Sequence, residues 1–117
     1  MKISITIDCP DPDQLAEFWV QFLGYVPRPD DGDGTYVTID RPDGVDGPPT
    51  LTFQRVCEPK ITKVRMHLDV YVEHAAPIVT AMIAAGATSL TTKEAGQWTT
   101  RVLQDPAGNE FCVIGPD

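Results

Sequence analysis

An internal repeat constrains this chain more than any other feature of its sequence. An alternation of apolar and polar residues over 3–8 is followed by a helical pattern over 12–23, and the same order returns over 65–72 and 75–85. At an offset of about 63 residues, apolar positions of the first strand fall on apolar positions of the second, and polar on polar. The sequence therefore predicts two strand–helix–strand–strand–strand units, each too small to bury its sheet alone.

The first helix has clear boundary signals. Asp11 can cap it, Pro12 occupies the first turn, where a proline costs little, and Gln14 completes a capping-box pattern. Gly24 is typical of a helix end. The apolar residues between them recur with helical spacing: Leu15, Phe18, Trp19, Phe22 and Leu23.

The other elements follow from the same kinds of pattern. In the second helix we expect Ile78, Met82 and Ile83 to form the packed stripe, with Gly86 at the end. Alternation and turn residues predict the remaining strands at 25–29, 35–40, 51–56, 87–91, 98–104 and 110–114. We expect one domain over 1–117, with repeats at about 1–57 and 64–115.

Composition excludes several classes of partner. With 117 residues and a formal net charge of −8, the chain is a poor match for nucleic acid or anionic membrane surfaces. No apolar run approaches the ~20 residues of a membrane span, and the first residues lack a signal-peptide pattern. The cysteines Cys9, Cys57 and Cys112 are odd in number and widely spaced, which indicates reduced thiols. We expect a cytoplasmic protein that binds neither nucleic acid nor membrane.

The most informative candidate residues lie on the polar face of the strand predicted at 65–72. His67 can serve as a general base or hydrogen-bond partner, and Arg65 can hold an anion. The alternative is structural: a hydrogen-bonded histidine, with Arg65 a surface charge that balances Asp69. Two positions apart on a strand, His67 and Asp69 are expected to be too distant for a direct hydrogen bond.

Three more residues are candidates because of where they lie on their predicted strands. Gln54 shares a face with Thr52 and is either a ligand contact or an exposed amide. Trp98 begins a strand and is either an aromatic wall for a flat ligand or a core or interface residue. Cys112 faces opposite to its neighbours Phe111 and Val113, but nucleophilic catalysis would need a base or cation beside it and is not favoured.

Several segments, in this order, resemble the glyoxalase and bleomycin-resistance superfamily of vicinal oxygen chelate proteins. They are Asp11 to Gly24, Phe53 to Val56 with Glu58-Pro59-Lys60, His67 to Val70, Gly86-Ala87, and Leu103 to Phe111. The resemblance covers the whole chain. It implies an α+β fold of two βαβββ units, whose curled mixed sheets form a cup for a small molecule, and commonly a homodimer.

In the metal-dependent relatives, four side chains reach into that cup. Carried onto this chain, the four places fall on Ser4, Gln54 (or Thr52), His67 and Cys112. Only His67 is an ordinary ligand, because hard divalent metals prefer carboxylate and imidazole. Glu110 shares the parity of Cys112 but lies about 6.6 Å earlier along the strand. A softer set of Cys112, His67 and Gln54 could hold zinc, but a resident metal is not favoured and the cofactor stays open.

Two functions of different classes follow. The first is a small-molecule-binding protein that sequesters or detoxifies its ligand without a complete metal site, with a cup lined by Gln54, Arg65, His67, Asp69, Trp98 and Cys112. The second is an enzyme of the lyase, isomerase or dioxygenase type, assisted by a metal or by His67 as a base. A domain with a packed, vestigial cup is a third possibility. The substrate and the occurrence of catalysis stay open.

Overall fold

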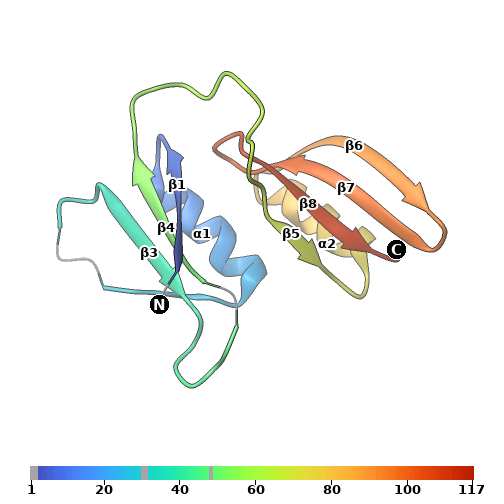
Figure 1. Cartoon of the computed structure of the whole chain (residues 1–117), viewed down its shortest axis with the longest axis horizontal. Helices are drawn as coiled ribbons and strands as arrows, with labels where there is room; N and C mark the ends of the chain where they lie inside the picture. Colours follow the sequence, from blue (N-terminus) through green and yellow to red (C-terminus); the bar gives the residue numbers. More distant parts are fainter. Residues whose placement is uncertain (1–2, 30–31, 48) are drawn as a thin grey trace. The chain divides into compact units, whose positions relative to one another are not determined.

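Both units predicted from the repeat are present. The computed structural model describes residues 3–29, 32–47 and 49–117. The chain divides into two compact units, Met1–Pro59 and Lys60–Asp117. Each unit contains one helix and one four-stranded mixed sheet (Figure 1). The element order is βαβββ in both, which confirms the predicted α+β architecture.

The first unit is built on a sheet with the strand order β1-β4-β3-β2. Its elements are β1 (Ser4–Cys9), α1 (Pro12–Leu23), β2 (Val26–Pro27), β3 (Tyr36–Asp40) and β4 (Thr50–Arg55). Strands β1 and β4 are parallel, and the other pairs are antiparallel. Strand β2 has only two residues, so it is shorter than the strand predicted at 25–29.

Helix α1 begins and ends at the predicted residues. The Asp11 carboxylate accepts a hydrogen bond of 3.2 Å from the backbone N–H of Gln14. Gly24 closes the helix in the left-handed conformation, with φ 68°, which a residue without a side chain adopts at little cost. The buried side of α1 includes Leu15 and Trp19. In the sheet, Ile39, Leu51 and Phe53 are buried.

The second unit repeats this plan with the strand order β5-β8-β7-β6. Its elements are β5 (Asp69–Tyr71), α2 (Ala75–Ala84), β6 (Thr88–Ala95), β7 (Trp98–Gln104) and β8 (Glu110–Gly115). Strands β5 and β8 are parallel, whereas β6, β7 and β8 are antiparallel neighbours. Strand β6 extends beyond the predicted 87–91, because a tight turn through Gly96 brings Ala95 opposite Trp98.

Strand β5 differs most from the prediction. The expected strand at 65–72 is reduced to three residues, because the chain bends at Arg65 and Met66. Met66 is 82% exposed, so it does not extend the buried face as its alternation suggested. Leu68 still accepts a backbone hydrogen bond from Cys112, which joins the end of the bent segment to β8.

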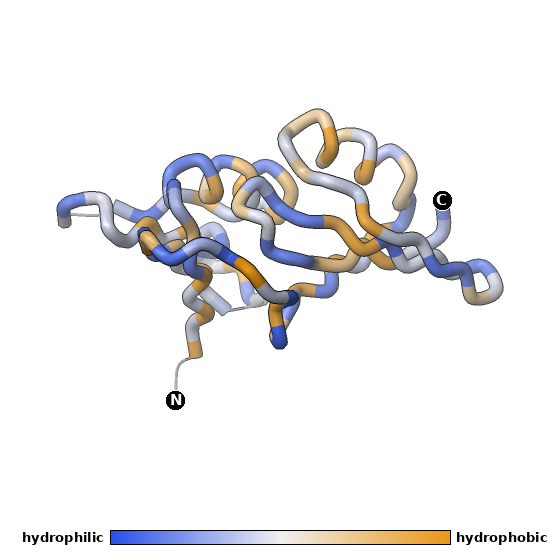
Figure 2. The backbone as a smooth tube through the Cα atoms, turned by 90° about the horizontal axis from the view of Figure 1, so that it is seen from above, coloured by the Kyte–Doolittle hydropathy of each residue, from blue (hydrophilic) through white to orange (hydrophobic). Residues whose placement is uncertain are grey.

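Helix α2 packs through a stripe that shares only Met82 with the one expected. Its buried residues are Ala75, Val79 and Met82, whereas Ile83 is 45% exposed. The helix contains no charged residue, and its path in Figure 2 is orange to white with only short pale blue stretches. Because nearly every position is apolar or small, the sequence pattern alone could not select the packed side.

Neither helix in the described part of the chain is long and apolar enough to cross a membrane.

The corrected stripe of α2 predicts a contrast between adjacent residues. Met82→Ala should lower the free energy of unfolding by about 2–5 kcal/mol, because it leaves a cavity at a fully buried site. Ile83→Ala should change it by only about 0.5 kcal/mol. Urea denaturation of both variants measures the difference. An equal loss for Ile83→Ala would mean that the stripe expected from the sequence is the packed one.

Candidate functional site

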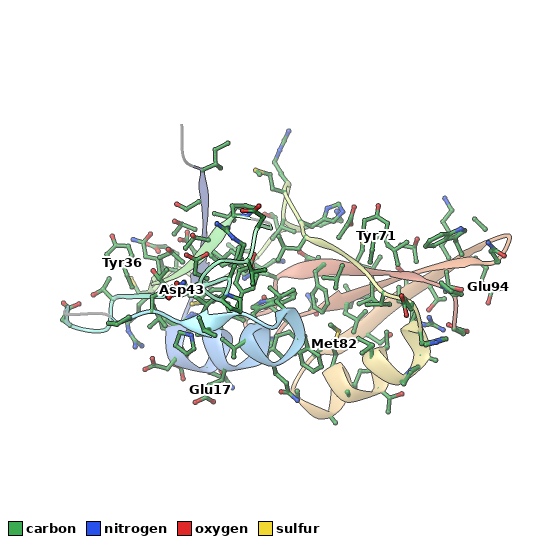
Figure 3. The ribbon with its side chains drawn as sticks, turned by 90° about the horizontal axis from the view of Figure 1, so that it is seen from below. Glu17, Tyr36, Asp43, Tyr71, Met82 and Glu94 are labelled. Atoms are coloured by element: carbon green, nitrogen blue, oxygen red, sulfur yellow. The ribbon has the colours of Figure 1, made fainter. Side chains whose placement is uncertain are left out.

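The second sheet has one packed face and one open face. Leu103, Phe111 and Val113 alternate along β7 and β8 and are at most 1% exposed, on the side where α2 packs. Strand registers place the intervening residues on the other side. We call this side the open face; it carries Asp69, Tyr71, Trp98, Thr100, Val102, Cys112 and Ile114. Figure 3 shows Tyr71 and the α2 residue Met82 on opposite sides of the sheet.

Three predicted site residues meet at one end of the open face. The imidazole Nε2 of His67 lies 3.2 Å from the Asp69 carboxylate. Asp69 is paired in register with Cys112 on the adjacent strand. One ligand atom from each of the three residues lies within 4.8 Å of the others. We call this group the polar cluster.

The contact between His67 and Asp69 corrects the expectation from sequence. Two residues apart on a regular strand, their side chains would be separated by about 6.6 Å along the chain. Strand β5 begins only at Asp69, and the chain before it is bent. The spacing rule for strands therefore does not apply to His67, whose ring reaches the carboxylate directly.

The electrostatics of the polar cluster keep the thiol protonated. Burial raises the pKa of Cys112, and the charge and hydrogen bond of Asp69 raise it further, while the charge of Lys63 lowers it to a smaller extent. A thiol with a raised pKa contains little thiolate at neutral pH, and the thiolate is the nucleophile. His67 lies beside Cys112, as nucleophilic catalysis would require, but the raised pKa works against it.

The donor types of the polar cluster fit some metals better than others. A thiolate, an imidazole and a carboxylate are all zinc ligands, and three protein ligands leave a position for water or substrate. Magnesium and calcium require sets of oxygen ligands, which these residues do not supply. His67, Asp69 and Cys112 could thus hold zinc, provided that the metal displaces the thiol proton. In this ligand set Asp69 replaces Gln54, which the sequence analysis grouped with Cys112 and His67.

Glu110 has a structural role two residues before Cys112. Its side chain is 8% exposed, and its carboxylate accepts hydrogen bonds from the Lys60 ammonium at 2.7 Å and the Val64 N–H at 3.0 Å. Burial raises the pKa of Glu110, but these hydrogen bonds and the Lys60 charge outweigh it and lower the pKa to about 2. Glu110 therefore anchors the segment 60–64, which leads into the polar cluster.

The other three predicted site residues lie outside the polar cluster. Trp98 lies on the open face and is 47% exposed. Arg65 is exposed within the bend. Gln54 belongs to the first unit, where its amide donates a hydrogen bond of 3.3 Å to the hydroxyl of Tyr36. No disulfide joins the three cysteines, and Cys57 is exposed.

Tyr71 is a site candidate that the sequence analysis left out. It is 68% exposed on the open face, and its register partner on β8 is Ile114. The alternation that singled out His67 and Asp69 also includes position 71, so the signal was present.

A cavity of about 290 Å³ in the first unit is a weaker candidate. Arg28 and Arg41 line it, and both lie within ion-pair distance of Asp40. Arg28 also pairs with Asp43 at 3.1 Å, and Arg41 donates to the backbone oxygen of Val45. The guanidinium groups are occupied in holding this loop together, which leaves little of their charge for a ligand.

The anchor at Glu110 predicts a specific dependence of stability on pH. Because the folded pKa is lowered from 4.5 to about 2, the carboxylate stabilises the fold above pH 4.5, and that contribution is lost as the pH falls through 2. Glu110→Gln should cost about 1–3 kcal/mol at neutral pH and flatten the fall in stability on acidification.

The control for this prediction is Glu94→Gln, which changes an exposed carboxylate on β6. Urea denaturation between pH 2 and pH 7 compares the two variants. If the free energy of unfolding depends on pH in the same way in Glu110→Gln, Glu94→Gln and the unmodified chain, Glu110 is not a stabilising anchor.

Comparison with known proteins identifies the family. In overall fold the chain is similar to a glyoxalase/bleomycin resistance protein/dioxygenase family enzyme from Burkholderia phytofirmans, with 20% identity, a TM-score of 0.76 and 97% of each chain covered. It is also similar to a glyoxalase-related enzyme from Fulvimarina pelagi, with 17% identity, a TM-score of 0.71 and coverage of 98% of this chain and 88% of that one. No curated protein sequence matches this chain significantly. The family model of the glyoxalase-like domain matches residues 4–114, and the chain therefore belongs to the glyoxalase-like domain family.

Proposed function

We propose that this chain binds a small organic molecule on the open face of its second sheet and sequesters it. The polar cluster forms the hydrogen-bonding end of this site. The observation that supports the proposal most is the position of the cluster, at the edge of a sheet face that also exposes Tyr71 and Trp98. Binding sites for small molecules commonly combine an apolar surface with a few placed polar groups.

The polar cluster retains hydrogen-bonding capacity for a ligand. The side chains of His67 and Asp69 are 39% and 42% exposed, so both are accessible. A carboxylate can accept about four hydrogen bonds, and an imidazole has a second nitrogen beyond the one that contacts Asp69. The contact also restricts both side chains, which reduces the entropy lost when a ligand binds.

The protonated state of Cys112 supports a binding role for this thiol rather than nucleophilic catalysis by it. Burial and Asp69 raise the pKa of its thiol, so it is a weak nucleophile at neutral pH. The cluster can still orient a ligand through hydrogen bonds. A protein that binds a toxic compound in this way needs no further reaction.

A second candidate is a metal-assisted enzyme of the lyase, isomerase or dioxygenase type. The three donor atoms within 4.8 Å of one another favour it. A metal ion bound there would polarise a substrate oxygen and stabilise developing negative charge. His67 would then be a ligand rather than a free base.

The first proposal predicts a contrast between the two histidines of the chain. A screen of small organic compounds by thermal unfolding should yield a binder that raises Tm by roughly 4–8 °C at a hundred times its Kd. His67→Ala should abolish most of this shift. His74→Ala should leave it unchanged, because His74 precedes α2 and its side chain makes no capping hydrogen bond. An equal shift in His67→Ala would contradict the assignment of the polar cluster to the site.

The metal candidate predicts a contrast between two cysteines. Titration with cobalt(II) should give thiolate-to-metal charge-transfer absorption that is absent in Cys112→Ser and retained in Cys57→Ser, since Cys57 is an exposed free thiol. Zinc should compete with the cobalt. No absorption in the unmodified protein, together with no stabilisation by zinc, would reject this candidate and leave the organic-ligand site.

A further inference from the structure

We infer that the ion pair between Lys60 and Glu110 positions His67 in the polar cluster. The pair holds the bent segment 60–68 in the path that brings the His67 ring to Asp69. This inference rests on the proposed function, because it concerns how that site is built. Neither residue of the pair belongs to the polar cluster itself. Both are therefore positioning residues, which act through His67.

Glu110 is a buried residue on the side of the second sheet that no helix of this unit covers. It precedes Cys112 by two residues on β8, so both side chains point to the same side. Segment 60–64 contacts the Glu110 carboxylate at two points. The Lys60 ammonium lies 2.7 Å from one oxygen, and the Val64 N–H donates to the other at 3.0 Å. The segment therefore crosses this end of the open face, beside the polar cluster.

Strand β8 holds the bent segment at two places. At the first, each oxygen of Glu110 accepts one hydrogen bond, which fixes both Lys60 and Val64. Hydrogen bonds that involve charged groups are stronger than neutral ones, and here the carboxylate side chain is only 8% exposed, so little water competes. At the second, the Cys112 N–H donates to the backbone oxygen of Leu68 at 2.9 Å.

The spacing of these two anchors makes the chain bend. On β8, Glu110 and Cys112 are two residues apart, which is about 6.6 Å along the strand. From Val64 to Leu68 an extended chain would span about 13 Å, at about 3.3 Å per residue. The bend at 65–66 takes up the surplus length.

Without the first anchor, β5 could continue as the regular strand expected from the alternation of its sequence. Asp69 is the register partner of Cys112, so a continued register would place His67 beside Glu110. His67 and Asp69 would then be about 6.6 Å apart along the strand, instead of in contact at 3.2 Å. Segment 60–64 occupies the Glu110 carboxylate and so closes this path.

Positioning of this kind contributes to binding. A ligand that bonds to both His67 and Asp69 loses least entropy when the two side chains are already held together. Residues that support a functional group thus influence affinity without touching the ligand. Lys60 and Glu110 have this role for the His67 ring.

NMR of the ligand-free chain tests the positioning directly. The chain has two histidines, and His74→Ala assigns their ring signals. In the unmodified protein we expect nuclear Overhauser effects between the His67 ring and the β-protons of Asp69 or Cys112. Lys60→Met should remove most of their intensity. Lys60→Arg should retain it, because the side chain keeps its positive charge.

The reactivity of the Cys112 thiol gives a second readout, because this thiol is part of the polar cluster. The background is Cys57→Ser, which removes an exposed thiol. There Lys60→Met should speed the reaction of Cys112 with iodoacetamide roughly tenfold, the factor expected for one lost charge-assisted hydrogen bond. Glu110→Ala removes both contacts to the segment and should have at least this effect. Peptide mass spectrometry distinguishes Cys112 from the buried Cys9.

Two control variants separate positioning from charge and from stability. Lys63→Met removes the same charge from an exposed residue of the same segment. Because the charge of Lys63 lowers the pKa of Cys112, its loss should slow the reaction with iodoacetamide rather than speed it. Met82→Ala weakens the core on the other side of the sheet and should leave the Overhauser effects of His67 in place.

The outcomes separate this inference from the proposed function, because none of these measurements needs a ligand. The inference is overturned if the Overhauser effects of His67 persist in Lys60→Met, or if Met82→Ala removes them equally. An equal rise of the thiol rate in Lys63→Met also overturns it. In each of these cases the ligand site is unaffected. If the effects vanish in Lys60→Met alone but the compound screen yields no binder, the positioning is confirmed and the proposed function fails. Lys60→Met carries the test even if Glu110→Ala does not fold.

Discussion

The alternation of side chains along β8 determines what each side of the second sheet can do. Phe111 and Val113 point to the side on which α2 packs and exclude water there. The residues between them, Cys112 and Ile114, must then lie on the opposite face, which no helix of this unit covers. A shift of one residue would exchange the two sets and expose the core. The burial of the core and the position of the candidate site are thus fixed by the same register.

The bent segment before β5 gives this face its chemistry. A regular strand would have held His67 and Asp69 apart, whereas the bend brings them to 3.2 Å. The segment is held at both ends: Glu110 binds Lys60 and Val64, and Cys112 donates its backbone N–H to Leu68. Functional residues often lie on irregular segments held by a rigid scaffold, and these polar contacts hold the segment that carries His67.

Much of the fold could be predicted from the sequence because its signals are local and repeated. The cap at Asp11, the glycine that ends α1 and the strand alternation each depend on a few neighbouring residues. The candidate face was also predicted in part, since the parity of Asp69, Trp98 and Cys112 follows from alternation. The ion pair between Lys60 and Glu110 joins residues 50 positions apart, and no local pattern indicates it. The bend at 65–66 and the packed side of α2 likewise depend on tertiary contacts.

The open face of the second sheet is the central element of the proposed function, as the ligand site. A crystal structure with the tightest binder from the compound screen tests it directly. We predict ligand density on the open face, beside the ring of Tyr71 and within hydrogen-bonding distance of Asp69 or His67. Density confined to the loop around Arg28 and Arg41, or to the α2 side of the sheet, would contradict the account.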